Sequence, residues 1–150
     1  SIFGVLCENY HGDALTTTRD AWLKEIEILK NSLSAWKHSD GHIIFEYDIV
    51  RLGKRIDVIL LIRHMVFSLE FKNGKDVFTA QDAQQAEDYA IDIKNFHKES
   101  ENLYVCPILI ATEAPAYQKE QSLLLFLFQD IVYQKSNMLF LFLHRVSLII

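Results

Sequence analysis

Two carboxylates and a lysine stand at the ends of two neighbouring apolar runs, where a charged side chain needs a specific reason. Asp57 opens the first run, Glu70 and Lys72 close the second, and Arg63 and His64 join the two. A buried charge is costly unless it is paired or binds a metal. Mg²⁺ takes carboxylate oxygens as ligands and keeps several waters, and a lysine beside such a metal can orient or deprotonate one of them. The three residues could therefore support metal-assisted hydrolysis of a phosphodiester.

The spacing of these residues predicts that they meet. Glu70 and Lys72 are two apart in an expected strand, so they project from the same face. If the hairpin turns symmetrically about Arg63 and His64, Asp57 lies opposite Glu70 with the Cβ atoms about 4.5–5.5 Å apart. Two carboxylates that close repel each other unless they share a proton or a cation. The alternative is a solvated hairpin end in which Lys72 simply pairs with a carboxylate.

Apolar periodicity predicts the elements that position these side chains. Steps of four and three predict a first helix with one buried stripe formed by Trp22, Ile26, Leu29, Leu33 and Trp36. Period-two alternation and continuous apolar runs predict the strands, and Gly53 and Asn73-Gly74 mark turns between elements. The expected elements are helices over residues 19–36 and 79–96 and strands over residues 43–49, 56–62, 65–71 and 103–111.

This order of elements predicts an α/β (α+β) domain with a central mixed sheet flanked by helices. Tight links make the first three strands an antiparallel meander, and the fourth joins the sheet by a crossover after the second helix. A length of 150 residues suits a single domain over residues 1–150 with one core. The apolar segment 123–150 is expected to form further strands and a terminal helix. It would pack on the core or on a domain absent from this chain.

Composition narrows the class of protein. Half of the residues are hydrophobic and 23% are charged, as in a globular chain rather than a disordered one. Cys7 and Cys106 form neither a disulfide framework nor a zinc pattern, which fits a reducing cytoplasm. We expect no secretory leader and no membrane span, because charges interrupt the apolar segment before about 18 residues. A net charge of −5 argues against a broad basic surface, but it is compatible with carboxylates around a divalent metal.

The motifs resemble the PD-(D/E)XK nuclease superfamily, whose restriction-endonuclease-like core is helix, three antiparallel strands, helix and strand. Its signature is an Asp followed on the next strand by Asp/Glu-x-Lys, matched here by Asp57 and Glu70-Phe-Lys72. RecB-like and Cas4-like members add Gln-x-x-x-Tyr on the following helix, matched by Gln85-Ala-Glu-Asp-Tyr89. The resemblance covers roughly residues 22–114.

The longer stretches of sequence from Phe45 to Asp57 and from Gln85 to His97 are similar to those of a narrower group of bacterial proteins. In these proteins the nuclease-like region precedes a Schlafen-type DNA/RNA helicase, a P-loop ATPase. This chain has no Walker A motif, so we expect the ATPase outside it. The resemblance implies a nuclease domain of a longer nuclease–helicase protein, acting on nucleic acid, with DNA as the expected substrate. Mg²⁺ is the expected cofactor, with Mn²⁺ as a substitute. The alternative is a catalytically inactive domain that binds nucleic acid or docks onto a partner ATPase or helicase.

The resemblance also implies roles for individual residues. Asp57 and Glu70 would bind the metal, and Lys72 would serve the attacking water. Gln85 would belong to the catalytic site. Tyr89, one helical turn further on, would contact the site or the nucleic-acid backbone.

Other charged residues leave two interpretations open. Arg51, Lys54 and Arg55 form a small basic cluster before the first acid, which either contacts phosphates or is a solvated turn that offsets nearby acids. Glu46 is either a further metal ligand or the structural partner of Arg51 or Arg55.

A further acid comes from the first helix in some nucleases of this fold. Glu25 lies at the edge of the apolar stripe of the first helix, whereas Glu27 points away from it. Glu25 is therefore the better-placed candidate for such a role.

Overall fold

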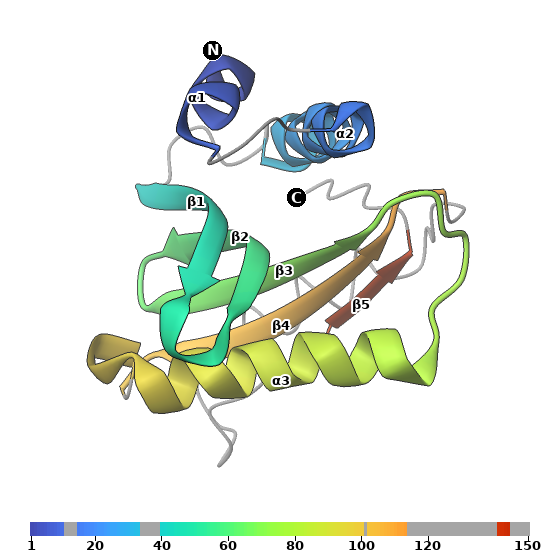
Figure 1. The fold of residues 1–150 in the computed structure, drawn as a ribbon. Helices are drawn as coiled ribbons and strands as arrows, with labels where there is room; N and C mark the ends of the chain where they lie inside the picture. The colour runs from blue at the N-terminus through green and yellow to red at the C-terminus, as the bar shows by residue number, and fades with distance from the viewer. Residues whose placement is uncertain (11–14, 34–39, 101, 114–140, 145–150) are drawn as a thin grey trace.

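Five strands form one mixed sheet with helices on both sides (Figure 1). The computed structural model describes residues 1–10, 15–33, 40–100, 102–113 and 141–144, with side chains described as far as residue 113. No helix within these ranges is long and apolar enough to cross a membrane. The elements in chain order are α1 (Ile2–Asn9), α2 (Thr16–Leu33), β1 (Gly41–Ile49), η2 (Val50–Leu52), β2 (Lys54–Ile62), β3 (Met65–Lys72), α3 (Ala80–Phe96), η3 (Lys98–Ser100), β4 (Tyr104–Ala111) and β5 (Leu141–His144).

The topology confirms the predicted meander and crossover. The strands lie in the order β1-β2-β3-β4-β5, with antiparallel pairing from β1 to β3 and parallel pairing from β3 to β5. A helix between β3 and β4 is what a parallel connection requires. Strand β5 lies in the apolar segment 123–150, where further strands were expected. The remainder of that segment, including the expected terminal helix, lies outside the described residues.

Helix α2 covers one face of the sheet through the predicted apolar stripe. Trp22, Ile26 and Leu29 are buried, Leu33 packs against the same core, and Trp36 lies outside the described residues. The other face packs against α3, where the small side chains of residues 86 and 90 are buried and allow the helix to approach the strands closely. In β3, odd-numbered residues face the α2 side and even-numbered residues face the α3 side. Glu70 and Lys72 therefore project toward α3.

The β2–β3 hairpin has the symmetric register that the sequence predicts. Ile62 pairs with Met65, and the pairing continues to Val58 and Leu69. The two-residue turn contains neither Gly nor Asn, and Arg63 adopts a left-handed φ of 55° in their place. The same register places the residue before Val58 opposite the residue after Leu69, one step beyond the last pair.

A capping box starts α3 at the predicted residue. The Thr79 hydroxyl accepts a hydrogen bond from the Asp82 N–H at 3.1 Å, and the Asp82 carboxylate accepts one from the Thr79 N–H at 3.0 Å. Because the cap sets where the helix begins, it also sets which residues of α3 face the sheet.

The packing of α3 on the sheet leads to a prediction about stability. Ile56 is fully buried (0% exposed) among residues of α3 and the sheet. We expect Ile56→Ala to lower the free energy of unfolding by about 2–5 kcal/mol, because it removes apolar contacts and leaves a cavity. Urea denaturation followed by circular dichroism measures the change. Ile43→Ala, at a position that is 45% exposed on edge strand β1, is the matched control and should cost clearly less. Equal losses in the two variants would contradict this account of the core.

Candidate functional site

Three acids form a row across three neighbouring strands. The pairs on either side of Glu46 and Asp57 keep one constant register between β1 and β2, so these two residues lie opposite each other. The β2–β3 register places Asp57 opposite Glu70. Regular pairing is interrupted at this row, where Glu46 has a φ of 55°. The row therefore marks the place where β1 and β2 separate from β3.

Asp57 occupies the point of separation. Its Oδ2 accepts a hydrogen bond from the Phe71 N–H at 2.8 Å, so the side chain takes the donor that strand pairing no longer uses. Burial, with a further contribution from the charge of Glu46, raises the pKa of the Asp57 carboxyl to about 6. The hydrogen bond from the Phe71 N–H and the charges of Lys72 and Arg55 act in the opposite direction and are outweighed.

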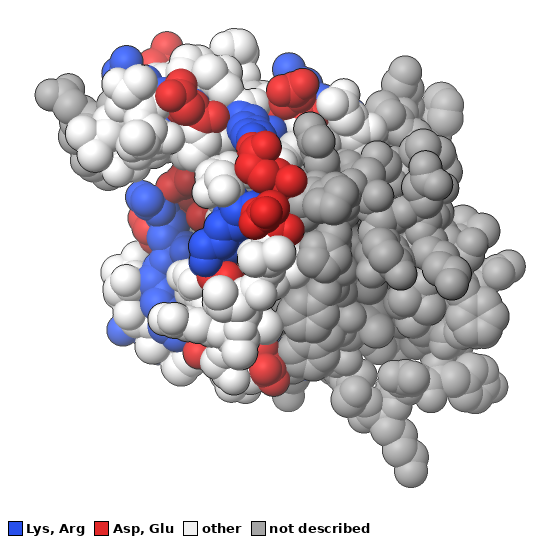
Figure 2. Space-filling model, turned by 90° about the vertical axis from the view of Figure 1, so that its right-hand side faces the viewer, with Lys and Arg blue, Asp and Glu red and all other residues white. Residues whose placement is uncertain are grey.

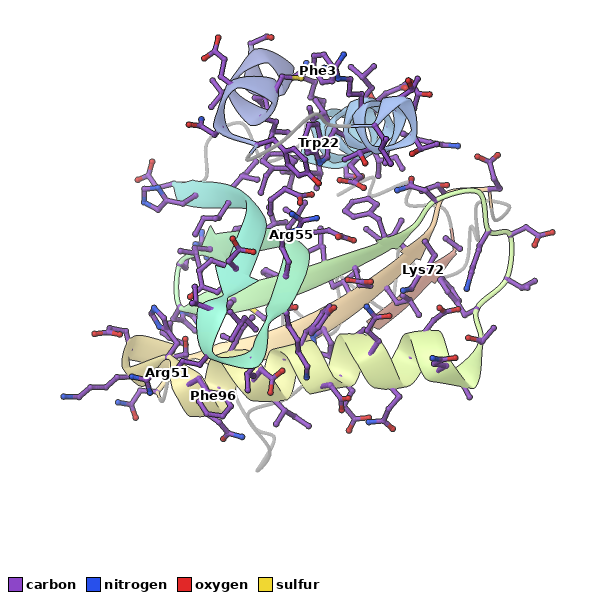
Figure 3. The ribbon with its side chains drawn as sticks, viewed as in Figure 1. Phe3, Trp22, Arg51, Arg55, Lys72 and Phe96 are labelled. Atoms are coloured by element: carbon purple, nitrogen blue, oxygen red, sulfur yellow. The ribbon has the colours of Figure 1, made fainter. Side chains whose placement is uncertain are left out.

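Glu70, Lys72 and Gln85 form one hydrogen-bonded group between β3 and α3. The Lys72 Nζ donates to Glu70 Oε1 at 2.9 Å and to Gln85 Oε1 at 2.8 Å. The Gln85 Nε2 donates to the same Glu70 oxygen at 2.9 Å and to the Tyr89 hydroxyl at 2.9 Å. Gln85 thus bridges Glu70 and Lys72, and Tyr89 fixes the orientation of its amide group. Figure 3 shows Lys72 on the α3 side of the sheet.

The surroundings of Lys72 keep its ammonium group charged. Burial by itself would lower the pKa of Lys72, but the hydrogen bond and charge of Glu70 and the charges of Asp82 and Asp57 raise it above its ordinary value. The Asp82 Oδ1 lies 3.6 Å from the Lys72 Nζ. In this arrangement Lys72 is a proton donor and a positive charge, and it is not a free base.

Glu25 of α2 joins the acids from the other side of the sheet. It is 3% exposed, and its Oε1 accepts a hydrogen bond from the Asn73 amide at 3.0 Å. Burial raises the pKa of the Glu25 carboxyl to about 8, and the charge of Asp57 adds to the effect. Burial and the charge of Asp57 likewise raise the pKa of Glu70 to about 7. Burial and mutual repulsion therefore disfavour the ionised form of each of these three carboxyl groups.

Two oxygens of this cluster are buried without a partner. The Oε2 atoms of Glu25 and Glu70 have no hydrogen-bond partner among the described residues. A buried acceptor without a partner costs about 1–3 kcal/mol, and more when it is charged. A divalent ion beside the Glu70 oxygen would satisfy it and would offset the repulsion between Glu70 and Asp57.

The donor set fits Mg²⁺ better than a softer metal. All of the converging acidic groups are carboxylates, and Mg²⁺ is bound through one or two of these with several waters retained. Among the described residues, no group of three or more His, Cys, Asp or Glu side chains is placed to hold a metal ion. A pair of carboxylates with retained waters is enough for Mg²⁺, and Asp57 and Glu70 are the pair that could hold one.

Glu46 has structural partners, in agreement with the second of the two roles considered for it. Its Oε1 accepts a hydrogen bond from the Trp22 indole N–H at 2.8 Å, and its Oε2 lies 2.7 Å from the Arg55 Nε. Arg55 also lies over the ring of Tyr10, which contacts Trp22 edge-on. Glu46 therefore connects β1 to α2 and β2.

Two of the three residues in the basic cluster are also paired with acids, and the third is exposed. Lys54 pairs with Asp92 at 2.8 Å and lies over the buried ring of Tyr89, and Arg55 is held by Glu46. Arg51 is exposed and makes no ion pair within the described residues. In Figure 2, Lys and Arg side chains are interleaved with Asp and Glu over the described part of the visible face. Of the three expected phosphate contacts, Arg51 is the one whose charge is open to a ligand.

Sequence reasoning missed two residues that support the site. Asn73 bonds Glu25, and Asp82 accepts hydrogen bonds from Lys75 at 2.9 and 3.0 Å while facing Lys72. Asp82 carries a sequence signal, because it stands three residues after the Thr79 cap. Asn73 has none beyond its place in a turn, since its partner is on a helix distant in the sequence.

No protein-family model matches the chain, and neither a curated protein nor a solved structure does. A functional assignment therefore depends on the geometry of the residues described above.

The buried acids make stability depend on pH. Folding raises the pKa values of Asp57, Glu70 and Glu25 from 3.8, 4.5 and 4.5 to about 6, 7 and 8. The folded protein thus holds protons that the unfolded chain releases, so the free energy of unfolding should fall as the pH rises from about 4, where the unfolded chain begins to release them, to about 8, where the folded protein has released them too. One unit of pKa difference corresponds to about 1.4 kcal/mol, so the fall should amount to several kcal/mol. Urea denaturation at a series of pH values in EDTA measures it.

Two variants on α2 separate this cause from others. Glu25→Gln should flatten the decrease, whereas Glu27→Gln, at an exposed position on the same helix, should leave it unchanged. Mg²⁺ should recover stability at the alkaline end by binding the ionised acids. A wild-type profile without a decrease, or equal slopes in the two variants, would show that the acids do not interact as described.

Proposed function

We propose that the domain is a metal-dependent nuclease of the PD-(D/E)XK type that hydrolyses phosphodiester bonds in nucleic acid, with DNA as the expected substrate. The observation that carries the proposal is the hydrogen-bonded group of Glu70, Lys72 and Gln85 next to Asp57. The expected motif residues come from three elements, β2, β3 and α3, and they converge at one place. The unpartnered Oε2 of Glu70 and the raised pKa values of the acids support a cation at that place.

Asp57 and Glu70 would hold Mg²⁺, or Mn²⁺ in its place, with Glu25 as a further acid. When bound, such a metal polarises a phosphate and makes a coordinated water more acidic. The carboxylates supply the negative charge that attracts the ion, and the Phe71 N–H keeps Asp57 in position.

Lys72 would act on the water and on the phosphate. Its Nζ–H groups can hold the attacking water and offset the negative charge that builds up on the phosphate oxygens. Gln85 positions this ammonium group, because it contacts both Lys72 and Glu70. Tyr89 is buried and hydrogen-bonded to Gln85, so its contribution is to orient that amide.

The resemblance to nuclease-like regions that precede Schlafen-type helicases supports a wider assignment. In that assignment the domain belongs to a cytoplasmic nuclease–helicase protein. The restriction-endonuclease-like fold is part of the same proposal, and the order and pairing of α2, β1–β3, α3 and β4 support it.

A catalytically inactive domain that binds nucleic acid or docks onto a helicase is the second candidate. The net charge of −5 and the pairing of Lys54 and Arg55 with acids favour it, because both reduce the attraction for a phosphate backbone.

Metal binding and cleavage can be measured separately to test the proposal. Calorimetry with Mg²⁺ reports the metal site, and a fluorescent oligonucleotide assay reports cleavage. Glu70→Gln should lose both signals. Lys72→Met should retain metal binding and lose at least about 100-fold in cleavage rate, since stabilisation of developing charge by one positioned donor typically contributes that much. Circular dichroism confirms folding of each variant.

Lys30→Met, at an exposed position on α2, is the control and should retain wild-type cleavage and metal binding. Equal cleavage by the wild type, Glu70→Gln and Lys72→Met would refute the assigned roles. Mg²⁺ binding without cleavage by the wild type would select the inactive candidate instead.

A further inference from the structure

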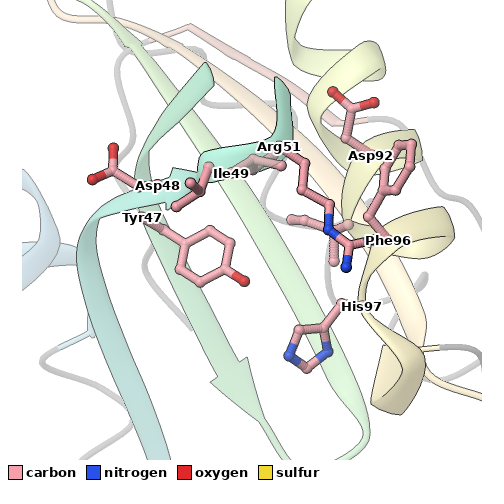
Figure 4. A pocket seen from close by; sticks show the side chains of 9 residues that line it. Tyr47, Asp48, Ile49, Arg51, Asp92, Phe96 and His97 are labelled. Carbon is pink, nitrogen blue, oxygen red and sulfur yellow. The ribbon is translucent and has the colours of Figure 1, made fainter. Parts of the chain in front are cut away.

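A surface pocket lies between the β1–β2 turn and the C-terminal half of α3, away from the acidic cluster. Its volume is about 180 Å³. Small-molecule pockets usually measure about 300–1,000 Å³, so this one has room for a single ring system. Figure 4 shows its lining, which includes Tyr47, Asp48, Arg51, Asp92, Phe96 and His97.

The side chains of the pocket combine flat rings with one available cation. Phe96 is 56% exposed although it is a large aromatic residue, and Tyr47 and His97 line the same pocket. The Arg51 guanidinium extends into the pocket between these rings (Figure 4). An aromatic face beside an arginine suits a nucleotide, because a base stacks on the ring and the guanidinium binds a phosphate.

The acids at the rim do not oppose this ligand. Asp92 is neutralised by Lys54 at 2.8 Å. Asp48 points away from the ring of Tyr47 in Figure 4, as expected for adjacent residues of a strand. The positive charge of Arg51 is therefore the one directed at a ligand in the pocket.

Helix α3 connects the pocket to the acidic cluster. Gln85, Tyr89, Asp92 and Phe96 recur at steps of four, three and four, so they form one stripe along the helix. Lys54 pairs with Asp92 and lies over the Tyr89 ring, which makes the stripe continuous. From Gln85 to Phe96 the helix rises about 16 Å. That length corresponds to about five stacked nucleotides at 3.4 Å each.

We propose that this pocket binds one unpaired nucleotide of the substrate strand, with its base against Phe96 and its phosphate on Arg51. The inference rests on the proposed function in that the ligand is a nucleic acid. A base inside a duplex is stacked on both faces, and it must leave the stack before it can enter a pocket. The domain accordingly prefers single-stranded or frayed nucleic acid to a blunt duplex.

Binding of labelled oligonucleotides, followed by fluorescence anisotropy, tests the proposal. The measurements use the Lys72→Met protein in Mg²⁺, and they are repeated with wild type in EDTA so that cleavage does not interfere. Phe96→Ala should weaken single-strand binding about five- to 140-fold, which is the range of one base–aromatic stacking interaction. Phe96→Trp should bind as tightly as the parent. Arg51→Ala should weaken binding. It should also reduce the slope of log affinity against log salt concentration by about one, as expected for the loss of one phosphate contact.

Three controls make the result specific to the pocket. Leu23→Ala removes an exposed apolar residue on α2 and should leave single-strand affinity unchanged. A blunt duplex should bind more weakly than a single strand and should be insensitive to Phe96→Ala. Strands shorter than about five nucleotides should not span from the pocket to the acids, so their cleavage should not respond to Phe96→Ala. Matched DNA and RNA strands show which sugar is accepted.

The outcomes separate the two proposals. If the wild type cleaves nothing but single-strand binding depends on Phe96 and Arg51, the nuclease assignment fails and the nucleotide pocket stands. If cleavage occurs and Phe96→Ala binds single strands as the parent does, the pocket assignment fails and the nuclease stands. Equal losses for duplex and single strand, or no binding of any oligonucleotide, would also overturn the pocket assignment.

Discussion

The burial of several carboxylates at one junction is the constraint around which the described structure is arranged. Glu25, Asp57 and Glu70 come from three different elements, and burial raises the pKa of each. Replacing such a cluster with apolar residues would be expected to increase stability, since buried charges are costly. The sheet instead opens at this point, and the Phe71 N–H that strand pairing leaves free is used to hold Asp57.

Helix α3 forms the second wall of the site, and its cap determines what that wall presents. Asp82 closes the capping box and also faces Lys72, so one residue sets both the start of the helix and part of the field around the lysine. Gln85, three residues later, then meets Glu70 and Lys72. Helix register and site electrostatics are thus coupled through the Asp82 carboxylate. Burial by itself would raise the pKa of Asp82, but the hydrogen bonds from Thr79 and Lys75 and the charge of Lys72 outweigh it and hold the pKa well below its ordinary range.

The polar residues of α1, α2 and β1 have a different role from the acids at the junction. Trp22, Glu46 and Arg55 form a connected group that includes Tyr10, and this group attaches the N-terminal helices to the sheet. A charge used in this way is no longer available to a ligand. Arg51, at the end of the α3 stripe, keeps its charge open within the described part of the chain, while the neighbouring Lys54 and Arg55 are paired with acids.

Local sequence patterns determined the order of elements, the symmetric hairpin and the start of α3, because periodicity, turn residues and capping act over a few positions. The same patterns predicted that Asp57 and Glu70 are opposed, since strand pairing converts spacing into position. Spacing made Glu25 a candidate and left two roles open for Glu46, but only the tertiary structure decided that Glu25 is buried against Asn73, that Glu46 pairs with Arg55 and that Arg51 stays open to solvent. Each of those outcomes depends on contacts between residues on different elements, and the free energy of a charged side chain depends on which partner packing brings to it. No spacing within one element specifies that choice.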